Sequence, residues 1–160
     1  MKIWIASIVI LLGAATLFAQ TVPPPPAPSV APVDYSGMYT FRKEGEFVQI
    51  TVENPGRVTG FVSRYGDGES DEGAFLNQFF KQGTLDGKKL NFTTETVHGV
   101  WFEFKGIVDR GPGKTPSEEG YYILKGKLTE NRTDVNKKVS SNSTQVVFKS
   151  FPRDVEEGSE

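Results

Sequence analysis

The chain of 160 residues contains no cysteine and only one histidine, His98. The lack of cysteine excludes disulfide bonds, thiolate metal sites and cysteine nucleophiles. A single imidazole excludes a metal site built from several histidines. His98 precedes Gly99 at an expected chain reversal, so the sequence predicts an exposed turn histidine. These absences favour a binding protein over an enzyme, and no cofactor is implied.

Proline is also scarce outside one segment, because six of the ten prolines lie in residues 22–33. Proline fixes the backbone φ angle and has no amide donor, and it therefore favours an extended polyproline II spacer. We predict a proline-rich linker over residues 20–33. A ligand for a proline-recognising groove is the alternative, although an exported chain seldom meets such domains.

The first 19 residues place Lys2 before an apolar run over residues 3–18, which Ala19 follows. This order is typical of a secretory signal peptide. The run is shorter than the roughly 20 residues that a membrane-spanning helix needs. We therefore predict a signal peptide over residues 1–19, export to the periplasm or the extracellular space, and no stable membrane insertion after cleavage. An uncleaved anchor is the alternative.

Residues 34–153 are long enough to bury one hydrophobic core and too short for two. The four acidic residues after position 153 crowd a segment with few apolar residues, so we predict a disordered acidic tail over residues 154–160. Without that tail the domain is close to neutral. It lacks the basic field expected of a protein that binds nucleic acid or anionic lipid.

Alternation of apolar and polar residues with a period of two dominates the domain. It predicts eight strands, in residues 37–43, 46–53, 57–63, 79–85, 88–96, 99–108, 119–130 and 144–151. Residues 75–80 fit either a helical turn or a strand. Residues 54–56, Asn-Pro-Gly, predict a type II turn, and residues 86–87, Asp-Gly, predict a tight hairpin. We predict an all-β domain, a single antiparallel up-and-down β-barrel of about eight strands, because closure removes exposed strand edges. A β-sandwich is the alternative.

A family resemblance begins at Gly37-Met38-Tyr39, which opens the first expected strand, and extends through the aromatic hairpins bounded by glycine. This pattern resembles the calycin group of lipocalin and avidin-like barrels over about 120 residues. Lipocalins usually carry tryptophan where Tyr39 stands, and Trp101 is the only tryptophan of the domain, whereas avidins have several in their pocket. The resemblance implies an architecture and no binding residue.

The loop over residues 64–73 offers hard oxygen ligands at Asp67, Glu69 and Asp71. Their spacing begins like a calcium loop, but Glu72 stands where glycine is required and Gln78 where a bidentate acid is required. We therefore expect a solvated strand connection, with a weak cation site as the alternative.

Glu95 and Glu103 flank one expected hairpin and raise the alternative of a carboxylate pair of the glycosidase kind. No serine nucleophile motif accompanies them. A secreted hydrolase with an unrecognised carboxylate site is therefore an alternative function. An eight-stranded outer-membrane barrel is another, but outward lysines such as Lys125 and Lys149 oppose it.

Aromatic residues are the one enriched class, with twelve Phe, five Tyr and two Trp. Several strands carry them on both faces, as at Trp101 and Phe102 and at Tyr121 and Tyr122. One face fills the core, and the other face predicts a pocket or an apolar patch. We therefore predict an exported, non-enzymatic barrel that binds a small apolar ligand or a protein partner. The predicted binding residues are Trp101, Phe102, Tyr121 and Tyr122.

Overall fold

A computed structural model describes residues 34–68 and 71–153, which belong to one compact unit. The predicted signal peptide, proline-rich linker and acidic tail lie outside the described residues. Among the described residues, no helix is long and apolar enough to cross a membrane.

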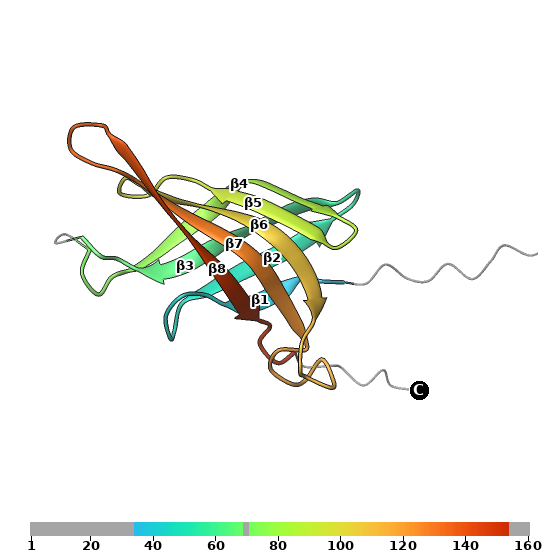
Figure 1. Cartoon of the computed structure of the whole chain (residues 1–160). Helices are drawn as coiled ribbons and strands as arrows, with labels where there is room; N and C mark the ends of the chain where they lie inside the picture. Colours follow the sequence, from blue (N-terminus) through green and yellow to red (C-terminus); the bar gives the residue numbers. More distant parts are fainter. Residues whose placement is uncertain (1–33, 69–70, 154–160) are drawn as a thin grey trace, which may run out of the picture. The chain divides into compact units, whose positions relative to one another are not determined.

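Eight antiparallel strands form one sheet in which each strand pairs with its neighbour in the sequence, as the period-two pattern predicted (Figure 1). The up-and-down barrel architecture is thereby confirmed. The strands are β1 (Gly37–Thr40), β2 (Phe47–Glu53), β3 (Arg57–Tyr65), β4 (Phe75–Asp86), β5 (Lys89–Thr94), β6 (Val100–Arg110), β7 (Tyr122–Thr133) and β8 (Val139–Lys149).

The sheet curls until β1 meets β8, but this closure is short. Tyr39 and Ser150 form an isolated antiparallel bridge, and the amide of Phe151 donates to the carbonyl of Met38 at 2.9 Å. Because β1 has 4 residues and β8 has 11, most of β8 has no strand on its second side. We call the gap beside residues 139–147 of β8 the seam.

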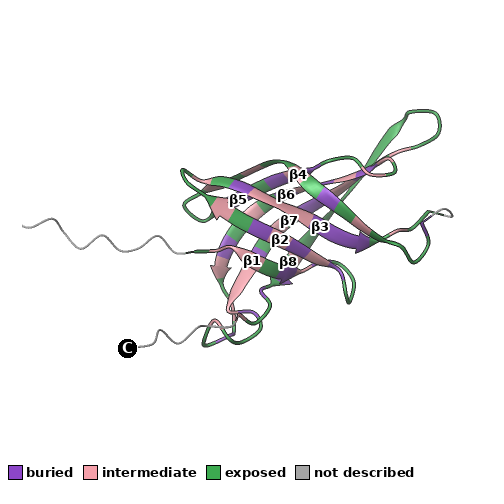
Figure 2. Ribbon diagram, turned by 180° about the vertical axis from the view of Figure 1, so that it is seen from behind, coloured by how far each residue is buried: buried purple, intermediate pink, exposed green. Residues whose placement is uncertain are grey.

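The interior of the curled sheet holds the hydrophobic core, as the alternating buried and exposed positions along the strands show (Figure 2). Tyr39 is fully buried, and its hydroxyl donates to the carbonyl of Tyr35 at 2.8 Å. This bond satisfies the polar atom of a ring that otherwise packs as a core side chain. The core consists of Tyr39, Phe41, Val48, Ile50, Val58, Val62, Leu90, Phe92, Val100, Phe102, Phe104, Val108, Leu124, Leu128 and Phe148.

Gly106 and Gly126 face each other across β6 and β7. A Cβ on Gly126 would lie 2.5 Å from the Cα of Gly106 and 2.4 Å from the carbonyl oxygen of Lys105. The two strands approach more closely here than any side chain allows, which permits the tight coiling of a small barrel.

Residues 75–80, which fitted either a helical turn or a strand, form the first half of β4. Two local features differ from the sequence-based expectations. The turn after β2 begins one residue earlier than expected, because the amide of Gly56 donates to the carbonyl of Glu53 at 2.8 Å. Strand β8 begins at Val139, five residues before the expected start.

Candidate functional site

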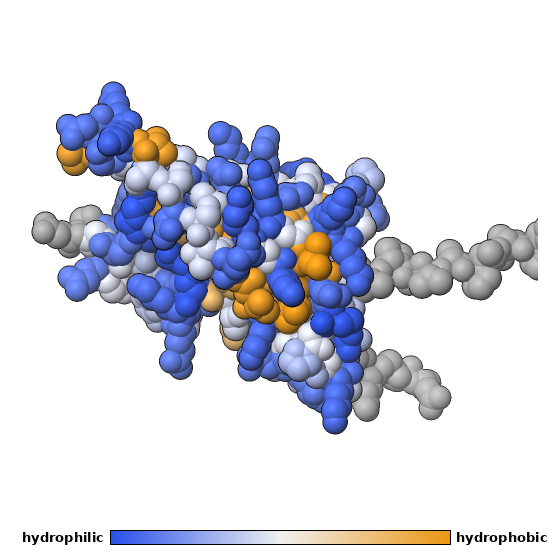
Figure 3. Space-filling model, in the orientation of Figure 1, coloured by the Kyte–Doolittle hydropathy of each residue, from blue (hydrophilic) through white to orange (hydrophobic). Residues whose placement is uncertain are grey.

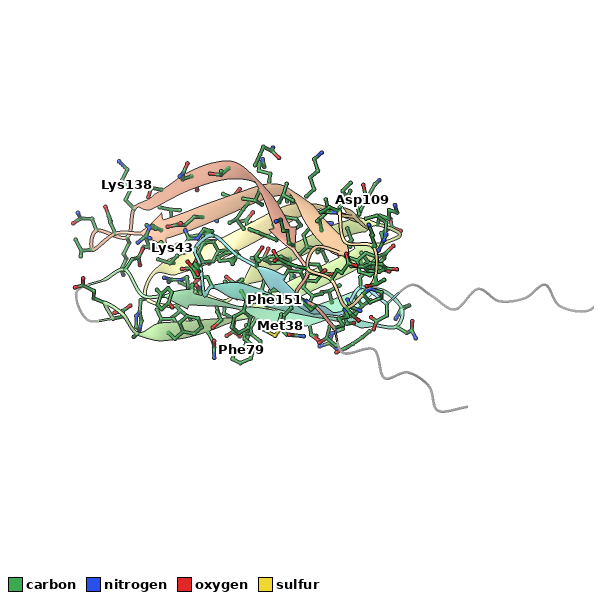
Figure 4. The ribbon with its side chains drawn as sticks, turned by 90° about the horizontal axis from the view of Figure 1, so that it is seen from below. Met38, Lys43, Phe79, Asp109, Lys138 and Phe151 are labelled. Carbon is green, nitrogen blue, oxygen red and sulfur yellow. The ribbon has the colours of Figure 1, made fainter. Side chains whose placement is uncertain are left out.

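Antiparallel strands place alternate loops at opposite ends of the barrel. We call the end that carries residues 41–46, 66–68, 71–74, 95–99 and 134–138 the mouth, and the other end the foot. In Figure 4, Lys43 and Lys138 lie at the mouth and Asp109 lies toward the foot. The β7–β8 hairpin extends away from the rest of the mouth (Figure 1).

The centre of the mouth is closed by polar and charged side chains. Arg64, which is 1% exposed, donates from Nε to Oε1 of Gln78 at 2.6 Å. The amide of Gln78 in turn donates to the carbonyls of Val100 at 2.8 Å and Glu95 at 3.1 Å. The guanidinium carbon of Arg64 lies 5.7 Å from the centre of the Phe102 ring. These contacts fix the Arg64 head group above the aromatic core.

Ion pairs extend this closure across the mouth. Asp67 pairs with Arg64 at 3.4 Å and also with Arg132. Glu130 pairs with Arg132 at 2.6 Å and also with Arg42. The hydrogen bond from Arg132 is the main reason why the pKa of Asp67 lies below its usual range. Burial lowers the pKa of Arg64, although an arginine stays charged at any physiological pH.

A cleft of about 340 Å³ opens at the seam, beside the closed mouth. Its apolar walls come from the β1–β2 loop and from the inner faces of β7 and β8. The polar groups at its rim come from the same three elements. The apolar residues are Phe41, Leu128, Val146, Val147 and Phe148, and the polar ones are Arg42, Glu130, Asn142 and Thr144.

The apolar part of this seam cleft is continuous with the core. The Phe41 ring lies 5.2 Å from that of Phe148 and 5.3 Å from that of Phe102, measured between ring centres. Phe41 and Phe148 are buried, and Val146 packs partly buried against the core. An apolar group in the cleft would therefore touch an existing hydrophobic surface, while polar atoms at the rim would fix its orientation.

The structure does not bring together the four aromatic residues predicted as a binding site. Phe102 is fully buried near the mouth, next to Phe41. Trp101 lines a separate hollow of about 570 Å³ with Lys81, and its register partner on β7 is Asn131.

Tyr121 and Tyr122 lie at the foot, because Tyr122 pairs with Arg110 at the end of β6. Their ring centres are 4.7 Å apart, and the guanidinium carbon of Arg110 lies 3.4 Å from the centre of the Tyr121 ring. These tyrosines contribute to a packed aromatic and cationic cluster. Sequence reasoning missed the cleft residues Phe41, Val146 and Phe148 because only the seam distinguishes them from other inward apolar residues.

The residues predicted as a weak cation site have other partners. Asp67 pairs with two arginines, as described above. Asp71 is 6% exposed, and its Oδ2 lies 2.5 Å from Nδ1 of His98. Glu69 lies outside the described residues. In the described part of the chain, no three His, Asp or Glu side chains are grouped closely enough to hold a metal ion.

His98 occupies the turn that the sequence predicted, with a positive φ of 49°. His98 and Asp71 are 27 residues apart in the chain, so no local sequence motif predicted their contact. The predicted alternative pair, Glu95 and Glu103, is divided between the loop after β5 and the middle of β6, where Glu103 accepts from Asn131 at 3.4 Å.

The outer face of β2–β4 carries the exposed aromatic surface that the sequence predicted as one alternative. Ring centres are 5.6 Å apart for Phe61 and Phe79, and 4.9 Å apart for Tyr65 and Phe75. Phe79 is 56% exposed. Figure 3 shows a second group of hydrophobic side chains on an otherwise hydrophilic face. The side chain of Val147 on β8 is also half exposed.

Comparison with known proteins shows the fold alone. No family model matches the chain, and no curated protein matches it. The crystal structure of rhizavidin matches with a TM-score of 0.56 and 12% identity over 77% of this chain and 87% of that chain. The rhizavidin–biotin complex matches with a TM-score of 0.55 and 12% identity over 78% and 98% of the two chains. The fold of this chain thus resembles that of the avidin-like, calycin-type β-barrels.

Proposed function

We propose that this chain is an exported, non-enzymatic β-barrel protein that binds a small apolar ligand in the seam cleft. Export rests on the order of charge, apolar run and small residue in residues 1–19. The proposal of a small apolar ligand rests on the volume and the lining of the seam cleft.

The size and lining of the seam cleft support this function. Its volume of about 340 Å³ lies at the lower end of the roughly 300–1,000 Å³ that ligand pockets occupy. Such pockets combine mostly apolar walls with a few polar groups that orient the ligand. Phe41, Leu128 and Phe148 provide the walls. The rim carries the neutral hydrogen-bonding groups of Asn142 and Thr144 and the ion pair of Arg42 with Glu130.

The fold likeness also supports a small ligand, because one matching structure is that of rhizavidin with biotin. The centre of the mouth is filled by Arg64, Gln78 and their ion-paired neighbours, so we place the ligand beside it, in the seam cleft. We therefore propose a small, mostly apolar molecule with one or two hydrogen-bonding groups.

Filling the cleft tests the proposal. Val146→Trp places a large ring in the cleft, whereas Ile107→Trp adds the same ring to β6, where Ile107 is 38% exposed. The probe is the neutral fluorophore N-phenyl-1-naphthylamine, titrated into the full chain. We expect Val146→Trp to weaken binding at least tenfold and Ile107→Trp to leave it unchanged.

Far-ultraviolet circular dichroism establishes that both variants remain folded. Thr144→Trp is a second cleft-filling variant if Val146→Trp unfolds the chain. Equal binding by all variants, or equal losses in the cleft-filling variants and the control, would exclude the seam cleft as the ligand site.

A further inference from the structure

Strand β8 has one paired side and one open side. The amide of Ser150 donates to Tyr122 on β7, whereas the amides of Lys149 and Phe151 donate to Thr40 and Met38 of β1. Amides alternate in direction along an antiparallel strand. The amides and carbonyls of odd-numbered residues therefore point away from β7. For residues 139–147 they point into the seam, where the described part of the chain provides no pairing strand.

The open edge lacks the features that usually prevent strand pairing. Natural edge strands carry charges, prolines or bulges that block association. Residues 139–147 contain no charged residue and no proline, and their pairing with β7 is regular. The nearest charges flank this stretch: Lys138 precedes it, and Lys149 follows it where β1 already covers the edge. The other edge of the sheet, β1, has only 4 residues.

The same nine residues are complementary to a second copy of themselves. A two-fold axis at Ser143 places Val139 opposite Val147 of the second copy, and Ser141 opposite Gln145 of the second copy. The two valines are 52% and 53% exposed, and such cross-strand apolar pairs stabilise a sheet. In this register every odd residue faces an odd residue, so each pair exchanges two backbone hydrogen bonds.

We propose that the chain forms a two-fold symmetric dimer in which the β8 strands pair antiparallel across the seam. Each copy then contributes Asn142 and Thr144 to the inner side of the junction, next to the seam cleft of the other copy. The interface is smaller than the 20–30 residues a side of a standard complex, so the dimer is weak and depends on concentration.

A single cysteine at the two-fold axis tests the register without any ligand. The chain has no natural cysteine, so Ser143→Cys introduces one thiol. Directly paired residues have Cα atoms about 5.5 Å apart, which a disulfide spans. The matched control is Ser141→Cys, two residues away on the same face. Its two copies would lie about 14 Å apart, beyond the reach of a disulfide.

We expect the full chain with Ser143→Cys to form a disulfide-linked dimer at least tenfold faster than Ser141→Cys under oxidised glutathione. Sedimentation of the cysteine-free chain should show a dimer that increases with concentration. Gln145→Pro should weaken it at least tenfold and Gln145→Ala should not, because only proline removes an edge amide. Equal cross-linking of the two cysteine variants, or a monomer at every concentration, would overturn the proposal.

Discussion

Single residues decide how the mouth is closed. Arg64 is a buried cation that contacts the side-chain amide of Gln78, the carbonyl of Tyr65, the carboxylate of Asp67 and one aromatic ring. Gln78 links it to two carbonyls on the next hairpin, so its amide group satisfies three hydrogen bonds inside the barrel. Leaving such buried partners without a bond costs more than the bonds themselves contribute.

We predict that Gln78→Ala lowers the free energy of unfolding by about 2–4 kcal/mol, because it removes the buried acceptor of Arg64 Nε and the donor to the carbonyls of Glu95 and Val100. The matched control is Gln82→Ala, which truncates an exposed glutamine on the same strand and should change stability by less than about 0.5 kcal/mol. Urea unfolding measures both values. Equal effects of the two substitutions would contradict the role given to Gln78.

The ion pair between Asp67 and Arg132 makes stability depend on acidity. Because the pKa of Asp67 is lowered in the folded chain, its stabilising effect is present above the unfolded pKa and is lost as the pH falls through the folded pKa. Both partners are partly exposed, so we expect Asp67→Asn to cost only about 0.5–1 kcal/mol at pH 7. Urea unfolding at pH 7 and pH 2 should show this difference vanish in acid. A difference independent of pH would contradict the assignment.

The inward apolar residues were predictable from the sequence, whereas the polar mouth was not. Val48, Ile50 and Phe104 follow the alternation of their strands and are buried as expected. Arg64 and Gln78 occupy inward positions at the mouth, where local patterning gives no reason to bury a charge. Their pairing depends on the register of β3 with β4, which the sequence does not encode locally.

At the scale of elements, the β7–β8 hairpin shows that the start of a strand can depend on its pairing partner and not on a local sequence pattern. Residues 139–143 read Val-Ser-Ser-Asn-Ser and lack apolar alternation, so the sequence predicted no strand there. They form one because β7 provides an ordered partner, with Thr133 opposite Val139 and Asn131 opposite Ser141. Neither face of this stretch packs on the core, so its residues need not alternate between apolar and polar, and this alternation is the pattern from which strands are predicted.

The close approach of β6 and β7 gives a prediction at the same scale. Gly126→Ala would place a Cβ 2.4 Å from the carbonyl oxygen of Lys105, and the strands would have to separate. We expect a loss of about 1–3 kcal/mol, as for other overpacked sites. Thermal unfolding measures it. An unchanged or raised melting temperature would contradict the role of this contact in coiling the barrel.

For the whole molecule, the central feature is incomplete closure. The sequence predicted eight strands in an up-and-down barrel, and the sheet has that order. It did not predict that β1 would be so short that the barrel closes at one bridge and leaves the seam beside β8. The length difference between the first and last strands creates the cleft. The site therefore depends on how the first and last strands of the domain meet, and local sequence patterns do not predict contacts between segments so far apart in the chain.

Methyl NMR of the full chain provides the most direct test of the proposed function. The methyl signals of Leu128 and Val146 report the seam cleft, and those of Ile107 on β6 report a site away from the cleft. On titration with N-phenyl-1-naphthylamine, we predict saturable shifts of the Leu128 and Val146 methyl signals, with Ile107 unmoved. Saturable shifts confined to other residues, or the absence of any saturable shift, would contradict a ligand site at the seam.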